Sequence, residues 1–282
     1  MKLLTFIFFC LLSAFAMAEQ FQAPVTDTRW QVVESPLECS LMQTIPGFGE
    51  AGFYRGNGGR LQMVFNTDSL PARQNHVSFQ VAAAPWQNST EQLELTSKAT
   101  ENGQQRFNLE GMLAQEAFNY LQEGRFPLIQ YHSQAYQEAI KVMLSTVKLN
   151  DSLPAFRQCL SNLHPDTFDQ VNQLTVFFQL EQSSLDTAAQ RALNRLASYA
   201  KLDDSIRQIR ISSHTDSHGR RSLNEPLSDA RANAVKNYLI QQHGIAASLI
   251  RVESHVAYKP AASNKTVEGR ARNRRAEITL IR

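Results

Sequence analysis

The sequence predicts an α+β protein with two domains, a β-rich N-terminal domain followed by a smaller β/α/β/α/β two-layer sandwich. Over residues 19–163, β-branched and aromatic residues recur in short segments between turn formers, which is typical of strands. After residue 173, strand-like and helix-like segments alternate, which favours a small sheet with helices on one face. The charge changes as well: residues 207–282 carry 14 lysines and arginines against 6 acidic residues, a net charge of +8, and the rest of the chain carries −6. This asymmetry indicates two modules, the second suited to an anionic or carboxylate-bearing partner.

Residues 1–18 have the pattern of an export signal. Lys2 is followed by an apolar run over residues 3–17, and residues 16–18 (AMA) form a small-x-small cleavage site. The run is short for a membrane span, and a retained membrane anchor is the alternative. Cys10 follows two phenylalanines rather than the small residues of a lipoprotein signal, so we expect no lipid anchor. No later segment is apolar enough to cross a membrane, so we expect a soluble, exported mature protein.

Cleavage of this signal would leave two cysteines, Cys39 and Cys159. Because an exported protein meets an oxidising compartment, an even pair favours a single disulfide between them. Two buried free thiols are the alternative. The chain has no C-x-x-C pair, which disfavours thiol redox catalysis and a cysteine zinc site.

The N-terminal domain, residues 19–163, combines strands with two short helices. Its clearest strand-like segments are WQVVESPLECSLMQTI, RLQMVFNTD and HVSFQVAAAPW. Residues 109–124 have apolar side chains at helical spacing and end at Gly124, and residues 153–163 predict a second helix that carries Cys159. No segment has the spacing of a known reaction centre, so we interpret this domain as a scaffold that binds another protein.

Residues 164–173 (HPDTFDQVNQ) predict a linker to the C-terminal domain, residues 174–282. In that domain, LTVFFQLEQSSLD predicts a strand, AAQRALNRLASYAKL a helix and IRQIRISSHTD the next strand. A long helix follows, with Pro226 in its first turn and Gly244 as its end. SLIRVESHV and RRAEITLI supply two further strands.

The long helix carries an arginine in an unexpected place. Arg231 lies in the middle of its predicted apolar face, where a guanidinium is costly to bury without a partner. The apolar residues of that face recur at i, i+3, i+4 spacing and are Leu227, Ala230, Ala234, Val235 and Tyr238. Arg231 is therefore a candidate for contact with a ligand or an ion-pair partner.

Three separated blocks carry a family resemblance. They are HTDSHG, then N..LS..RA..V..YL from Asn224 to Leu239, then EGRARNRRAEI from Glu268 to Ile278. In this order they resemble the OmpA-like peptidoglycan-binding domain over residues 174–282. The resemblance implies that the two-layer sandwich has the OmpA-like fold.

The resemblance also implies a ligand site. In OmpA-like domains the aspartate of TD and the arginine of LS..RA bind meso-diaminopimelate of the wall peptide, and these positions match Asp216 and Arg231. Diaminopimelate has an ammonium and a carboxylate on one carbon, so Asp216 would accept from the ammonium and Arg231 would bind the carboxylate bidentately. The other residues at matching positions of the pocket rim and wall are Asn224, Leu227, Asn273 and Arg274.

Each of these motifs has an alternative interpretation. Arg231 and Asp216 could pair with each other as a structural salt bridge. His214 and His218, at i, i+4 spacing, could hold a metal on a helix, but they fall in a strand-to-loop segment. We therefore interpret them as solvated loop histidines and expect no metal and no cofactor. RARNRR, residues 270–275, could be a nucleic-acid patch, but in an exported protein we interpret it as pocket wall and expect no nucleic-acid partner.

The whole layout, an export signal, a β-rich domain with a cysteine near each end and an OmpA-like domain, resembles the MotY family of the flagellar motor T ring. The resemblance implies a non-enzymatic periplasmic protein of a Gram-negative bacterium that binds peptidoglycan in a ring assembly. It implies that the protein helps to recruit and anchor stator units, in particular of sodium-driven polar flagella. Its N-terminal domain would attach to the basal body and to a MotX-like protein.

Two other functions remain as hypotheses. A general envelope-stability protein would tether the cell wall to another envelope protein. A wall hydrolase with an OmpA-like targeting domain is disfavoured, because the first domain has no paired-carboxylate, zinc or nucleophile motif.

Overall fold

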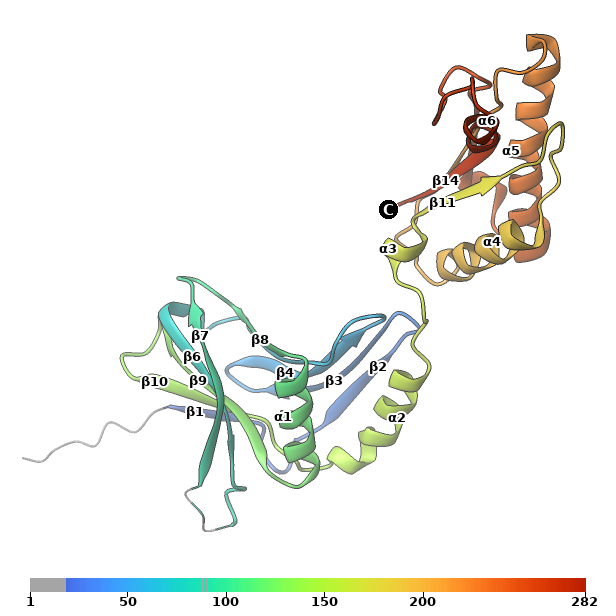
Figure 1. Ribbon diagram of the computed structural model, residues 1–282. Helices are drawn as coiled ribbons and strands as arrows, with labels where there is room; N and C mark the ends of the chain where they lie inside the picture. Colours follow the sequence, from blue (N-terminus) through green and yellow to red (C-terminus); the bar gives the residue numbers. More distant parts are fainter. Residues whose placement is uncertain (1–18, 88, 90) are drawn as a thin grey trace, which may run out of the picture. The chain divides into compact units, whose positions relative to one another are not determined.

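The structure, a computed structural model, describes residues 19–87, 89 and 91–282 (Figure 1). The predicted export signal, residues 1–18, lies outside the described residues. The chain divides into two compact units, with the division between Ser161 and Asn162. In the part of the chain that the structure describes, no helix combines the length and the apolar character needed to cross a membrane.

Two five-stranded sheets form most of the N-terminal unit (Figure 1). Their strands are β1 (Gln20–Gln22), β2 (Trp30–Glu34), β3 (Glu38–Ile45), β4 (Gly49–Gly56), β5 (Gln62–Thr67), β6 (Ala72–Ala82), β7 (Gln92–Thr100), β8 (Arg106–Glu110), β9 (Phe126–Ser133) and β10 (Ala139–Met143). One sheet has the order β2-β3-β4-β5-β8, with all neighbours antiparallel. The other has the order β1-β10-β9-β6-β7, with β1 parallel to β10.

Both predicted helices of this unit are present, as α1 (Met112–Gln122) and α2 (Leu149–Ser161). Contacts between aromatic rings connect both helices to the first sheet. The ring of Phe118 in α1 lies 4.9 Å from that of Phe53 in β4 and 5.7 Å from that of Phe156 in α2, measured between centroids. Phe107 of β8 packs in turn against Tyr131 of β9, 4.4 Å away. One apolar core therefore joins both sheets and both helices.

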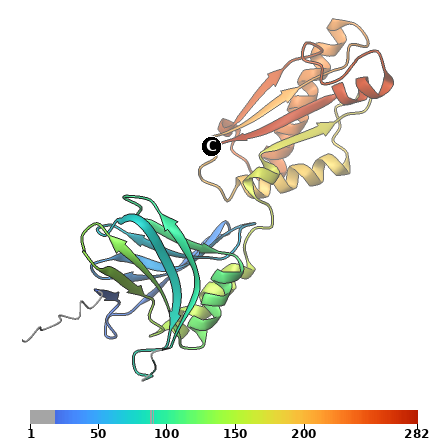
Figure 2. The ribbon, with the colours of Figure 1, turned by 60° about the vertical axis from the view of Figure 1, so that its left-hand side comes forward.

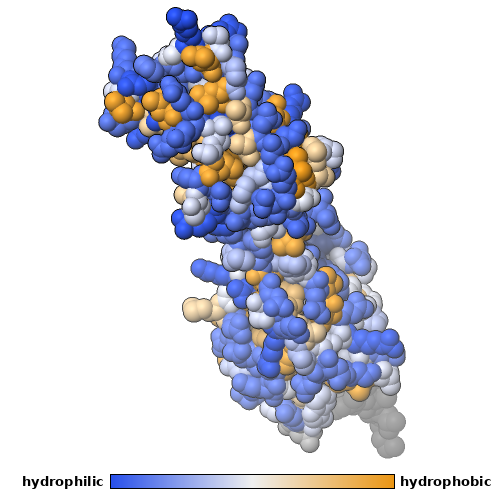
Figure 3. All heavy atoms as spheres, turned by 90° about the vertical axis from the view of Figure 1, so that its right-hand side faces the viewer, coloured by the Kyte–Doolittle hydropathy of each residue, from blue (hydrophilic) through white to orange (hydrophobic). Residues whose placement is uncertain are grey.

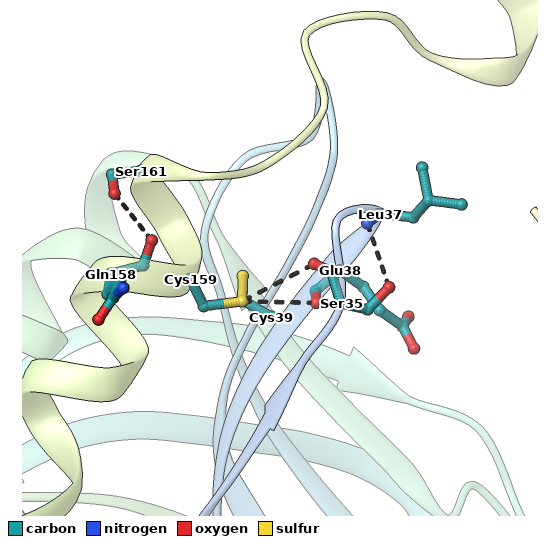
Figure 4. Close-up of a disulfide and its surroundings, with 7 residues drawn as sticks. All are labelled: Ser35, Leu37, Glu38, Cys39, Gln158, Cys159 and Ser161. Atoms are coloured by element: carbon teal, nitrogen blue, oxygen red, sulfur yellow. Dashed lines mark hydrogen bonds between the residues drawn. A yellow bond between two sulfur atoms is a disulfide. The ribbon is translucent and has the colours of Figure 1, made fainter. Parts of the chain in front are cut away.

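The disulfide expected between Cys39 of β3 and Cys159 of α2 is confirmed (Figure 4). The two Cα atoms are 5.9 Å apart and 120 residues separate the cysteines in sequence. Both cysteines are buried, and the sulfur of Cys159 lies 3.8 and 3.7 Å from the carbonyl oxygens of Ser35 and Glu38. The bond fastens the last turn of α2 to the sheet and closes most of the N-terminal unit into one covalent loop.

A four-stranded sheet with helices on one face forms the C-terminal unit, as predicted (Figure 2). Its elements are α3 (Phe168–Val171), β11 (Gln173–Phe177), α4 (Thr187–Ala200), β12 (Gln208–Ser213), α5 (Arg221–His243), a 3-10 turn (Ala247–Leu249), β13 (Ile250–Ser254), α6 (Val267–Asn273) and β14 (Arg275–Ile281). The strand order is β11-β14-β12-β13, in which β12 and β13 are parallel and the other neighbours antiparallel. The α+β class and the two-layer sandwich are confirmed.

Residues 164–173, predicted as a linker, instead belong to the C-terminal unit. The Asp166 carboxylate pairs with Arg195 of α4. The guanidinium carbon of Arg282, at the chain end, lies 3.8 Å from the ring centroid of Phe168 in α3. The polar residues that suggest a linker in the sequence therefore make ion-pair and cation–π contacts that tie this segment to the fold.

The long helix α5 differs from its prediction in its start and in its buried face. It begins at Arg221, so Pro226 is its sixth residue rather than part of its first turn. Ala230, predicted to be buried, is exposed, whereas the Ser228 hydroxyl is buried 2.9 Å from the Ser213 hydroxyl of β12. The buried residues are Asn224, Ser228, Arg231, Ala232, Val235 and Leu239. Alanine occurs on both the buried and the exposed face of a helix. Apolar spacing therefore placed Ala230 on the buried face, although it is exposed. Gly244 ends the helix with a φ of 67°, as predicted.

Candidate functional site

The C-terminal unit contains a cavity of about 350 Å³ whose wall comes from three separate segments. These are the loop after β11, the stretch from the end of β12 into α5, and the residue before β14. Five of the six residues predicted to bind a ligand line it: Asp216, Asn224, Leu227, Arg231 and Arg274. The sequence analysis missed the remaining lining residues, which are Leu180, Glu181, Thr215, Gly219 and Leu223, together with His218, which it interpreted otherwise.

Arg231 is fully buried at this cavity, with 0% of its surface exposed. Its guanidinium donates three hydrogen bonds, all to backbone carbonyls: Nε to Gln182 at 3.0 Å, Nη1 to His214 at 3.0 Å and Nη2 to Gln179 at 3.2 Å. The guanidinium carbon also lies 5.2 Å from the ring centroid of Phe178. A guanidinium has five N–H groups, so two make no hydrogen bond with another described residue.

The alternative in which Arg231 pairs with Asp216 is wrong. Asp216 pairs with Arg274 instead, with Oδ2 3.0 Å from Nη1, and its Oδ1 accepts from the His218 N–H at 3.0 Å. Burial lowers the pKa of Arg231 to about 10, and the charge of Asp216 acts in the opposite direction. Arg231 therefore remains a cation at neutral pH, and its charge is not neutralised by a direct ion pair.

Arg274 connects Asp216 to the loop after β11. Besides its ion pair with Asp216, its Nε donates to the Phe178 carbonyl at 3.2 Å. The side chains of both residues are largely buried, 14% and 5% exposed. Two arginines thus fix the loop after β11 through its carbonyl groups, and the cavity wall is formed before any ligand arrives.

Asn224 and Leu227 contribute from the first turns of α5. The Asn224 amide donates to the His218 carbonyl at 3.0 Å and so holds the loop before the helix. Leu227 is half-buried at the cavity wall. Two further apolar residues are exposed at the cavity, Leu180 by 53% and Leu223 by 66%. On the face drawn in Figure 3, hydrophobic side chains lie in small groups among hydrophilic ones.

Asn273, predicted as part of the pocket, does not line the cavity. It is fully buried at the end of α6, a short helix that the sequence analysis did not predict. Its Oδ1 accepts from the N–H groups of Ala261 and Ala262, and its Nδ2 donates to the Asn264 side chain at 2.8 Å. Asn264 in turn accepts from the Ser217 N–H at 3.1 Å. Asn273 therefore supports the site from behind by fixing the loop that reaches Ser217.

The interpretation of both histidines as solvated is wrong for one of them. His214 is 2% exposed and lies beside His255, whereas His218 is exposed at the cavity. Burial lowers the pKa of His214 to about 4, and the positive charge of Arg275 acts in the same direction. Over the described ranges, no group of three His, Cys, Asp or Glu side chains is arranged to hold a metal ion.

Thr215 differs from the other lining residues because its hydroxyl has no partner. The residue is 2% exposed, and in the described part of the chain no group accepts from or donates to its Oγ1. A buried, unpaired hydroxyl lowers the stability of the free protein, and groups of this kind are rare in native structures. The sequence offers only its position next to Asp216 as a signal.

Two protein families match this chain, one in its N-terminal part and the other in its C-terminal part. Residues 21–165 match the family described as MotY N-terminal domain, and residues 177–274 match the OmpA family. The "Sodium-type flagellar protein MotY" of Vibrio parahaemolyticus is 26% identical over 270 residues, which cover 94% of this chain and 92% of that protein. The "Peptidoglycan-binding protein ArfA" of Mycobacterium bovis is 36% identical over 118 residues, which cover 41% of this chain but 36% of that protein.

Solved structures similar to this chain match over its C-terminal part. The cell wall anchor of the T6SS from Pseudomonas aeruginosa is 30% identical, with a TM-score of 0.34. The match covers 39% of this chain and 80% of that chain.

Proposed function

The chain belongs to the MotY family, and on this premise we propose that it is a periplasmic flagellar motor protein that binds peptidoglycan through its C-terminal unit. The match to the MotY N-terminal domain family and the relative over 94% of the chain support the motor context. The match to the OmpA family supports the wall-binding role. A 36% identical relative is itself named a peptidoglycan-binding protein.

The charge arrangement of the cavity carries the proposal. Arg231 and Arg274 present two cationic groups, and Asp216, paired with Arg274, presents a carboxylate in the same cavity. A group with an ammonium and a carboxylate on one carbon, as in diaminopimelate, needs such a set. The free N–H groups of Arg231 would bind the carboxylate, and Asp216 would accept from the ammonium. Because the arginines are already fixed by carbonyl groups, little conformational entropy would be lost on binding.

The proposed role is binding without catalysis. The side chains of Asp216, Arg231 and Arg274 are engaged with backbone groups or with each other, which suits recognition of a fixed charge pattern. The finer parts of the proposal follow from the family. The N-terminal unit attaches to the basal body and a MotX-like protein, and the assembled T ring recruits and anchors stator units. The sodium-type name of the V. parahaemolyticus relative favours a sodium-driven motor.

Sedimentation with isolated sacculi tests the wall-binding role. Asp216→Asn keeps the size of the side chain but removes its charge, and we expect affinity to fall about thirtyfold, since a charge-assisted contact of about 2 kcal/mol is lost. Asp203→Asn is a matched control. Asp203 is also buried, pairs with Arg282 and accepts from the Ser205 N–H, but it lies outside the cavity. Both variants should lose similar stability, and only the first should lose binding. Equal sedimentation of the two variants contradicts the proposal.

A deletion strain separates motor function from the alternative, a general tether of the envelope. Loss of swimming with flagella still present supports the motor role. Detergent sensitivity with normal swimming supports the tether, which remains the second candidate because the OmpA family also includes outer membrane proteins such as that of Bordetella avium.

A further inference from the structure

One residue of the cavity wall has a backbone conformation that its side chain disfavours. Residues 179–182 form a turn after β11, closed by a hydrogen bond from the Gln182 N–H to the Gln179 carbonyl at 3.2 Å. Glu181 is the third residue of this turn and has a φ of 56°, in the left-handed region. Glycine or asparagine is the usual residue at such a position. A glutamate there is strained, and strain of this kind often marks a binding site.

The buried arginines enforce this turn. Arg231 donates Nη2 to the carbonyl of Gln179 and Nε to the carbonyl of Gln182, so one guanidinium holds the first and the last residue of the turn. Arg274 holds the residue before it through the Phe178 carbonyl. The position of Glu181 at the cavity is therefore determined by two side chains that lie 50 and 93 residues further along the chain.

The carboxylates of Glu181 and Asp216 differ in whether other residues bind them. Glu181 is exposed, lines the cavity, and makes no hydrogen bond or ion pair with any other described residue. Both carboxylate oxygens of Asp216 already accept hydrogen bonds, from Arg274 and from the His218 N–H. A bound ammonium has three N–H donors and needs more than one acceptor. The carboxylate that is free to turn toward it is that of Glu181.

We propose that Glu181 is a second ligand carboxylate, which binds the ammonium of the zwitterionic group together with Asp216. The cavity then has two acidic and two basic side chains, and Arg231 acts as a positioning residue for Glu181 in addition to its own contact. The inference rests on the proposed function and deepens it. Glycine at this position would relieve the strain but would remove the carboxylate.

Calorimetric titration of the mature full-length protein with a tripeptide that ends in meso-diaminopimelate tests this. Glu181→Gln should bind about five- to tenfold more weakly than wild type with unchanged thermal stability. Glu181→Gly should bind as weakly, yet unfold at the same or a higher temperature, because glycine accepts the left-handed conformation. Glu268→Gln, an exposed glutamate outside the cavity, is the control and should bind like wild type.

A second ligand isolates the ammonium contact. Acetylation of the free amino group of the diaminopimelate removes its charge and should weaken binding to wild type more than binding to Glu181→Gln. The loss of affinity from acetylation and the loss from the substitution should therefore not be additive. Wild-type affinity in Glu181→Gln and Glu181→Gly, while Asp216→Asn still loses binding, overturns this inference alone. Absence of binding by the wild type, or no effect of Asp216→Asn, overturns the proposed function and this inference with it.

Discussion

The two units bury different kinds of polar residue. Among the described residues, those buried in the N-terminal unit are all uncharged: Thr28, Gln43, Thr67, Thr100, Ser133 and Ser145. The C-terminal unit buries charged side chains as well: Asp166, Asp203, Asp216, Arg231 and Arg275. Burial of a charge is costly unless hydrogen bonds or an opposite charge offset it. The first unit is therefore stabilised by an apolar core and a disulfide, whereas the second also buries charged side chains, of which Asp216 and Arg231 line the cavity.

Removal of the disulfide should give the largest effect, and in one unit only. In the chain-entropy account, the loop closed by Cys39 and Cys159 contributes about 5 kcal/mol to stability. A double variant, Cys39→Ser with Cys159→Ser, should lower the unfolding temperature of the N-terminal unit in differential scanning calorimetry. The transition of the C-terminal unit and sacculus binding should stay unchanged. A loss of sacculus binding in the double variant would show that wall binding depends on the disulfide of the N-terminal unit.

Replacement of the buried arginine should give a comparable effect in the other unit. Arg231→Ala removes three hydrogen bonds to backbone carbonyls and empties a fully buried position, so we expect a loss of about 3 kcal/mol from the C-terminal unit, together with loss of sacculus binding. Arg231→Lys should recover little, since one ammonium cannot reproduce the fork. Arg210→Ala, at an exposed arginine of β12, serves as control and should stay within about 0.5 kcal/mol of wild type. An unchanged unfolding temperature for Arg231→Ala would contradict the positioning role.

Acid should destabilise the C-terminal unit through His214. Its pKa is lowered to about 4 in the folded protein, whereas the unfolded value is about 6.5, so the unfolded state binds the proton first as the pH falls. The stability that neutral His214 provides is complete above about pH 6.5 and is lost as the pH falls toward 4, which amounts to about 2 kcal/mol between pH 7 and 5. Arg275, His255 and Lys259 oppose its protonation, and Glu277 favours it.

Urea unfolding at several pH values measures this difference. His214→Gln should remove most of the pH dependence between pH 7 and 5. His218→Gln, at an exposed histidine of the cavity, should leave it unchanged. Parallel curves for wild type and His214→Gln would rule out His214 as the source.

A matched pair of threonines should give the smallest effects, with a loss of stability in the N-terminal unit and no loss in the C-terminal unit. Thr67 in the N-terminal unit donates to the Phe48 carbonyl at 2.8 Å, so Thr67→Val should lower stability by about 1 kcal/mol. The Thr215 hydroxyl has no partner among the described residues, so Thr215→Val should leave the stability unchanged or raise it by up to about 1 kcal/mol. Chemical denaturation of both variants checks the signs, and equal destabilisation would show that the Thr215 hydroxyl is satisfied in solution.

Local signals in the sequence were sufficient for most of the elements and for the cysteine pair. Strand-like segments, the helix that carries Cys159 and the end of α5 at Gly244 all depend on residues near each other in the chain. The three OmpA-like blocks likewise located the residues of the cavity, because each block is continuous in sequence. By itself, the sequence therefore determined the two-domain α+β fold, the disulfide and five side chains of the candidate site.

The roles of those side chains were decided by contacts between distant segments. Arg274 lies 58 residues from Asp216 and is its ion-pair partner, and Arg231 lies 52 residues from the Gln179 carbonyl that it binds. The burial of His214, the supporting role of Asn273 and the strained Glu181 turn have the same origin. No periodicity reports which carbonyl a guanidinium will reach, because a hydrogen bond or an ion pair depends on separation in space and not along the chain. Only the tertiary structure could therefore show that the buried arginine holds the wall of the site as well as lining it.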